Sequence, residues 1–212
     1  VNMGLLGMAI AITTPLLVLY ATQHLGMTSG QYGLLMALAA GASFTVNSIV
    51  ARFSDNGKIN RKYLIATALI MGALCFSIYF YVHTIWIFIV LYGMFQGLAA
   101  PAMPQMYASA RESINESEYK DRSIFANTVL RSTFSLGFLF GPLIGTVLLS
   151  LLGYDGLFGG TVTIFLTVLV LLLLFYKEPK KILNNIVGNF SENNAPNLIK
   201  DPTLLIPFLA FI

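Results

Sequence analysis

Long apolar runs, separated by short polar connections, follow one another along most of the chain. An α-helix needs about 20 mostly apolar residues to cross the hydrocarbon core of a bilayer. Six runs meet that requirement: residues 1–21, 31–51, 63–82, 85–108, 123–152 and 157–176. The pattern therefore predicts an all-α membrane protein, a bundle of six transmembrane helices.

The last part of the chain departs from this pattern. Residues 177–200 are polar, basic and rich in asparagine, and a new apolar run starts near residue 203 and stops at Ile212. About ten apolar residues cannot span a membrane, so we expect the chain to continue beyond them. We predict three parts, which are the bundle over 1–176, a cytoplasmic linker over 177–200, and the start of a seventh transmembrane helix over 201–212.

Composition agrees with a lipid environment. Hydrophobic residues make up 57% of the chain and charged residues 10%, whereas a soluble domain carries about 25% charged residues. The single cysteine, Cys75, lies in an apolar run, which excludes a disulfide framework and a thiolate metal site. Because no HExxH helix, phosphate-binding loop or Ser/His/Asp set is present, we expect no enzyme activity, no metal or other cofactor, and no nucleic-acid partner.

The lysines and arginines gather on one side of the predicted membrane. Eleven of the twelve follow the second, fourth or sixth apolar run, and none lies in the other three connections. The positive-inside rule assigns the basic side to the cytoplasm. We therefore predict a multi-pass protein of the cytoplasmic membrane with its N-terminus in the cytoplasm.

The twelfth basic residue, Arg131, lies inside the fifth run. It follows Ser123 by about 12 Å along the helix axis, a depth at which an arginine costs about 2.5–3.5 kcal/mol and should face protein or a watery cavity. Asn127 and Ser135, four residues to either side, share its helix face. One interpretation is that this face lines a solute path, where Arg131 donates hydrogen bonds to a polar substrate.

A structural interpretation of Arg131 is equally open, and both can hold. Pro101 and Pro104 leave the carbonyls of Gly97 and Ala100 without their usual donors. Arg131 is expected at a similar depth to Pro101, about 12 Å from the cytoplasmic end. Its five N–H donors could satisfy that interrupted backbone.

Three uncharged polar residues, Gln96, Gln105 and Thr13, also lie within apolar runs. Taken singly, such residues more often hydrogen-bond to a neighbouring helix than bind a ligand. Together with Arg131 and Asn127 they suit a neutral, hydroxyl-rich substrate. We therefore name these five as candidate substrate-binding residues.

A stripe of small residues runs beside Arg131 on the same helix. Gly137, Gly141 and Gly145 recur every fourth position, a spacing that lets membrane helices pack closely. Pro142 lies inside the stripe and loosens the helix. The pattern predicts a helix that can rock against its neighbour.

Two strings resemble motifs of the major facilitator superfamily. "ARFSDNGKINRK" resembles its cytoplasmic motif between spans 2 and 3, with Asp55 as the acid and Arg61 and Lys62 as the basic end. "GFLFGPLIG" resembles its antiporter motif in span 5, with the three glycines and Pro142 in register. The resemblance implies one half of a twelve-helix fold, with a second six-helix half of the same protein as partner. It also implies that Asp55, Arg61 and Lys62 act in gating.

A narrower resemblance rests on "AMPQMYASARE" and the following "LRSTFSLGFLFGP". Together they are similar to the sugar efflux transporter family. This implies export of sugars or glycoside-like solutes by alternating access, driven by antiport of an ion, with a proton as the expected ion. A multidrug efflux transporter of the same superfamily is an alternative, and so is a non-transporting membrane receptor or scaffold.

Overall fold

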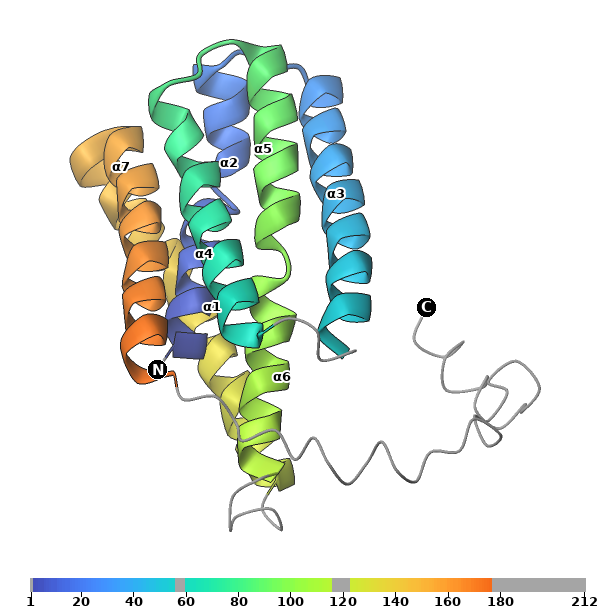
Figure 1. Ribbon diagram of the computed structural model, residues 1–212. Coiled ribbons are helices and arrows are strands. Elements are labelled where there is room, and N and C mark those ends of the chain that lie inside the picture. The colour runs from blue at the N-terminus through green and yellow to red at the C-terminus, as the bar shows by residue number, and fades with distance from the viewer. Residues whose placement is uncertain (1, 56–59, 116–122, 177–212) are drawn as a thin grey trace, which may run out of the picture. The chain divides into compact units, whose positions relative to one another are not determined.

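The structure is a computed structural model that describes residues 2–55, 60–115 and 123–176 (Figure 1). These residues lie in helices and in the short turns between them, and none of them lies in a strand. Residues Val1–Pro179 form one compact unit. The all-α prediction is confirmed. The predicted linker and the predicted seventh helix lie outside the described residues and stay predictions.

The first span consists of three helical pieces. They are α1 (Asn2–Thr13), α2 (Leu17–Leu19) and the π-helix η1 (Tyr20–His24). Pro15 explains the break, because it has no N–H to donate and its ring clashes with the preceding turn. The N–H of Leu16 bonds instead to the carbonyl of Thr13, at 3.0 Å. The sequence predicts a single span over residues 1–21, and the structure corrects both its continuity and its end.

The remaining spans follow the predicted order, with ends that differ by a few residues. They are α3 (Ser29–Asp55), α4 (Arg61–Ser77) with the 3-10 turn η2 (Ile78–Phe80), α5 (Ile85–Ala99), α6 (Ala102–Asn115) and α7 (Ser123–Phe175). The side chain of Asn60 caps α4 by accepting a hydrogen bond from the N–H of Lys62 at 2.8 Å. The helices α5 and α6 make one span, interrupted at Pro101.

The helix α7 contains two spans. Its 53 residues would extend about 80 Å as a straight helix, far more than the roughly 30 Å of a hydrocarbon core. The helix reverses at Gly153, where φ is 66° and ψ is −159°, a conformation essentially restricted to glycine. We call residues 123–152 the first arm and residues 154–175 the second arm. Five described helical segments are long and apolar enough to cross a membrane, and counting the two arms of α7 separately gives the six spans that the sequence predicts.

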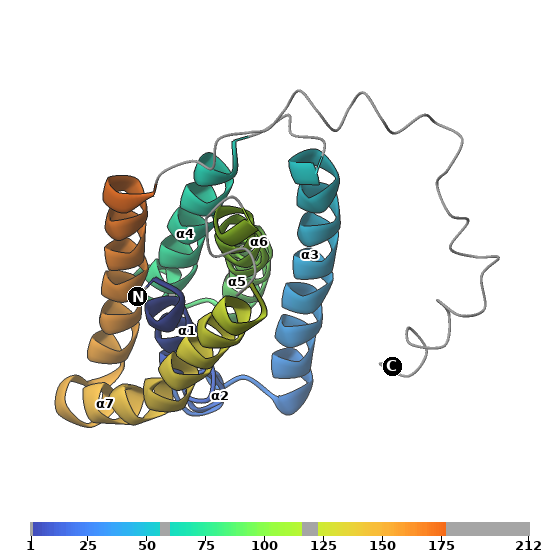
Figure 2. The same ribbon diagram turned by 90° about the horizontal axis from the view of Figure 1, so that it is seen from below.

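Close contacts between small residues and their neighbours hold the bundle together. The first arm packs on α1, the second arm packs on α4 and reaches α1 at Thr13, and α3 packs on α5. Gly72 of α4, for example, lies so close to the ring of Phe165 that an added Cβ would come within 2.6 Å of it. Figure 2 shows α3 at one side of the bundle, beside α5. Much of its surface is exposed, and this includes Phe44 and Ile49.

One end of the bundle collects the segments that the sequence predicts on one side. The start of α1, the end of α3, the start of α4, the end of α6 and the two ends of α7 all lie there (Figure 1). Two hydrogen bonds confirm this grouping: Lys62 Nζ donates to the carbonyl of Leu173 at 3.2 Å, and Ser109 donates to the Tyr176 hydroxyl at 2.7 Å. We call this end the basic end. Its assignment to the cytoplasm stays a prediction.

Candidate functional site

An open groove of about 960 Å³ runs between α6 and the first arm of α7. Its lining mixes apolar side chains with two arginines, an asparagine and hydroxyl groups. The lining residues are Met103, Pro104, Tyr107, Ala108, Arg111, Ile124, Asn127, Thr128, Arg131, Phe134 and Ser135. We call it the α6–α7 groove.

The groove brings together the polar face that the sequence predicts on the first arm. Arg131 lies in the groove with Asn127 one turn before it and Ser135 one turn after it. The side chain of Arg131 is exposed, and it lies within electrostatic range of the Tyr107 hydroxyl across the groove. Tyr107 and Phe134 face each other with ring centroids 6.3 Å apart. The site therefore combines a guanidinium fork, an amide and two aromatic rings.

The structure does not support the backbone-completing role of Arg131. Among the described residues, Arg131 makes no hydrogen bond to the carbonyl of Gly97 or of Ala100. The carbonyl of Gly97 accepts instead from the N–H of Ala100, at 3.3 Å. The kink at Pro101 thus has a local donor, and the donors of Arg131 remain available to the groove.

The other three candidate residues lie away from this groove. Thr13 is fully buried and shares a hydrogen bond of 2.5 Å with Thr161 of the second arm. Gln96 is half-buried, and its side-chain oxygen lies 3.6 Å from the Cys75 thiol. Gln105 is buried on α6. The groove therefore unites Arg131 with Asn127 alone among the five candidates, while Thr13 has the interhelical hydrogen bond that a structural role requires.

The glycine stripe of the first arm packs against α1. A Cβ added at Gly137 would collide with the carbonyl oxygen of Gly4, and one added at Gly141 would come within 2.5 Å of the Ala11 Cβ. The contact is reciprocal, because a Cβ on Gly7 would collide with the carbonyl oxygen of Phe134. Close approach of Cα–H groups to carbonyl oxygens recurs at helix interfaces and contributes about 0.5–1 kcal/mol each.

Gly145 extends the stripe to the break in the first span. A Cβ there would collide with the carbonyl oxygen of Ile12. This carbonyl lies at the end of α1, where Leu16 bonds to Thr13, three residues back, and Pro15 has no N–H. The stripe therefore lies against α1 up to the point at which the span is interrupted.

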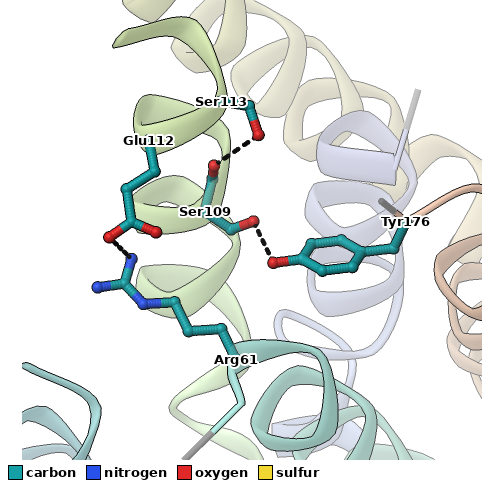
Figure 3. A network of polar contacts seen from close by, with 5 residues as sticks. All are labelled: Arg61, Ser109, Glu112, Ser113 and Tyr176. Carbon is teal, nitrogen blue, oxygen red and sulfur yellow. Dashed lines mark hydrogen bonds and ion pairs between the residues drawn. The ribbon is translucent and has the colours of Figure 1, made fainter. Parts of the chain in front are cut away.

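Arg61, one of the three gating candidates, lies at the basic end in the network that Figure 3 shows. Arg61 Nη1 of α4 lies 2.9 Å from Glu112 Oε1 of α6. On the same helix Ser109 donates to Tyr176, and the hydroxyl of Ser113 donates to the Ser109 carbonyl at 3.1 Å. These contacts join α4, α6 and the end of α7.

The remaining gating residues have separate surroundings. Lys62 reaches the second arm through its bond to Leu173. Asp55 ends α3, and its side chain lies outside the described part of the chain. The predicted gating role of these residues stays a prediction.

Several residues of these sites were missed by sequence reasoning. Tyr107 and Phe134 line the groove, and Glu112 pairs with Arg61. Tyr107 and Glu112 belong to the string "AMPQMYASARE", so the signal for both was present. The pairing of Thr13 with Thr161 had no such signal, because 148 positions separate them.

Comparison with known proteins gives one family. The model of the family described as Major Facilitator Superfamily matches residues 1–212. The chain is 29% identical over 154 residues to a Deinococcus radiodurans protein named "Putative sugar efflux transporter", covering 73% of this chain and 39% of that one. It is 26% identical over 212 residues to "Sugar efflux transporter A" of Escherichia coli, covering 95% of this chain and 52% of that one.

A third relative repeats this pattern. "Sugar efflux transporter A" of Dickeya chrysanthemi is 26% identical over 177 residues, covering 83% of this chain and 44% of that one. The matches therefore span about half of each relative's length or less.

Proposed function

Because the chain belongs to the Major Facilitator Superfamily, we propose that it is the first half of a secondary transporter that exports sugars or glycoside-like solutes. The similarity to three proteins named sugar efflux transporters supports this direction and this solute class. The observation that carries the proposal is the α6–α7 groove, in which Arg131 and Asn127 lie beside two aromatic rings.

The chemistry of the groove fits a sugar. A guanidinium offers five N–H donors in a planar fork that can hold two acceptors at once, and the Asn127 amide both donates and accepts. The faces of a pyranose ring are apolar, and Tyr107 and Phe134 offer rings against which such a face can pack. The groove is open on one side, and a second six-helix half of the full protein would cover it.

The proposed mechanism is alternating access. The first arm and α1 meet through small residues, so that they can shift against each other without displacing large side chains. At the basic end, the network around Arg61 and Glu112 joins the helices that must separate or close around the solute path. Asp55, Arg61 and Lys62 would then act together as the gate.

Coupling to a proton gradient is the expected source of energy. All nine acidic residues lie in connections or near span ends, so we place the proton-carrying carboxylate in the second half. By the positive-inside rule, the basic end and the N-terminus face the cytoplasm. Solute would then leave the cytoplasm while protons enter, across the cytoplasmic membrane.

The test is flux through the full-length protein. Purified protein is reconstituted in liposomes loaded with a radiolabelled glucoside, and release is followed with and without a pH gradient. We expect release that requires the protein and that is faster with the gradient. Absence of release for every sugar tested, alongside efflux of an apolar dye, would contradict sugar export and favour a drug transporter. Absence of any flux would leave a receptor or scaffold.

A further inference from the structure

The α6–α7 groove is positively charged along its length. Arg111 and Arg131 both line it, and no aspartate or glutamate does so among the described residues. Neither arginine forms an ion pair with a described residue. The carboxylate of Glu112, which is adjacent to Arg111 in the sequence, is paired with Arg61 (Figure 3).

The two arginines line the same groove, Arg111 on α6 and Arg131 on the first arm of α7. Arg131 lies within electrostatic range of Tyr107, and Tyr107 precedes Arg111 by about 6 Å along the axis of α6. This offset is one helical turn, similar to the length of a single pyranose ring. Arg111 lies toward the basic end and Arg131 lies deeper, with Asn127 on the same arm between the levels of Ile124 and Arg131.

Among the described residues no carboxylate compensates the two guanidinium groups, which the proposed second half would cover. A buried charge is tolerated when it is paired and hydrogen-bonded, and its burial is otherwise costly. A neutral sugar could accept hydrogen bonds from one arginine, but it would leave both positive charges uncompensated. An acidic group on the solute would supply the missing charge and accept two parallel hydrogen bonds from one guanidinium fork.

We infer that the solute of this groove is a sugar that carries an acidic group, either a carboxylate or a phosphate. This inference rests on the proposed function, which it narrows to anionic sugars. One arginine binds the acidic group while the other, with Asn127, binds ring hydroxyls. Tyr107 and Phe134 pack against the apolar face of the ring.

The experiment measures binding of three matched probes to purified full-length protein by calorimetry. Glucose, glucuronate and glucose 6-phosphate differ only in the group at C6. We expect at least one of the two acids to bind about tenfold more tightly than glucose, or about 1.4 kcal/mol.

Substitutions of single arginines show which residues cause the preference for acidic sugars. Arg131→Gln and Arg111→Gln should each remove most of the preference for the acid. Arg52→Gln makes the same change of charge on an exposed part of α3 outside the groove, and it should keep the preference. Thermal unfolding of each variant shows whether it is folded.

Three results would overturn the inference. Glucose could bind as tightly as both acids, the preference could survive in both groove variants, or inorganic phosphate and acetate could compete as well as the sugar acids. None of these results bears on the transport of neutral sugars, so the proposed function would stand. If no sugar of either class binds or crosses the membrane, the proposed function fails as well.

Discussion

Arg131 presents its donors to the α6–α7 groove and bonds to none of the described residues. At the scale of single residues, this separates it from Thr13, whose hydroxyl is already satisfied by Thr161. A polar residue with a partner inside the bundle contributes to packing. One without a partner that lies in a groove is available to a solute.

Arg131→Lys tests this distinction. Lysine keeps the charge but loses the planar fork that holds two acceptors. We expect solute affinity to fall about tenfold, or about 1.4 kcal/mol, while thermal unfolding stays close to that of the unchanged protein. Solute binding and unfolding of purified full-length protein measure the two effects. Arg131→Ala serves as the comparison: if only this variant changed, and through its stability, Arg131 would be structural.

Helices meet through backbone atoms rather than side chains at the interface of α1 and the first arm. Sequence reasoning found the stripe of Gly137, Gly141 and Gly145, because its spacing is local. It could not find α1 as the partner, because that depends on how distant helices pack. The proline at position 15 indicates a break in the helix. Because the residues around it form one apolar run, the pattern predicts an uninterrupted span.

Gly137→Ala should destabilise this interface. The added Cβ would meet the Gly4 carbonyl oxygen, so the two helices must separate. Overpacking of this kind costs about 1–3 kcal/mol, and we expect a lower unfolding temperature. Gly159→Ala is the matched control in the same helix, because the nearest atom to its Cβ would be Phe80 Cζ at 3.9 Å. Equal unfolding temperatures for the two variants would contradict the close approach.

The ion pair between α4 and α6 should matter more for transport than for stability. The Glu112 side chain is 47% exposed, and exposed pairs contribute about 0–1 kcal/mol. We expect Glu112→Gln to leave unfolding nearly unchanged and to slow transport in liposomes. The charge swap Arg61→Glu with Glu112→Arg should restore part of the rate. A swap as slow as the single variant would show that the pair itself is not the functional element.

For the whole molecule, the lengths of the apolar runs and the charges of the loops predict six crossings. They also predict that the N-terminus and the last residues of α7 lie at the same end of the bundle. The number of crossings depends on the cost of exposing polar groups to lipid, which is a property of each segment by itself, and the common end follows because that number is even. The groove was only half predicted. The i±4 spacing places Asn127 and Arg131 on one face, but the choice of α6 as the opposite wall depends on tertiary packing.

Sidedness is testable with single cysteines. We expect Lys58→Cys and Lys181→Cys to react with a membrane-impermeant maleimide from the same, cytoplasmic side. The native Cys75 is 1% exposed, so it should add little background labelling. Reaction of the two sites from opposite sides would contradict the four crossings that we expect between residues 58 and 181.

Gly153 joins the first and second arms of α7 without a loop between them. The two arms can therefore change their relative position only through the backbone dihedral angles near residue 153, which set the angle between the arms and the rotation of one arm relative to the other. The first arm contacts α1, and the second arm contacts α4 at Gly72 and also α1, whose Thr13 bonds to Thr161, so a change in the angle at Gly153 must disturb at least one of these contacts. Any change in the angle between the two arms must therefore be taken up by the backbone of Gly153 and its immediate neighbours.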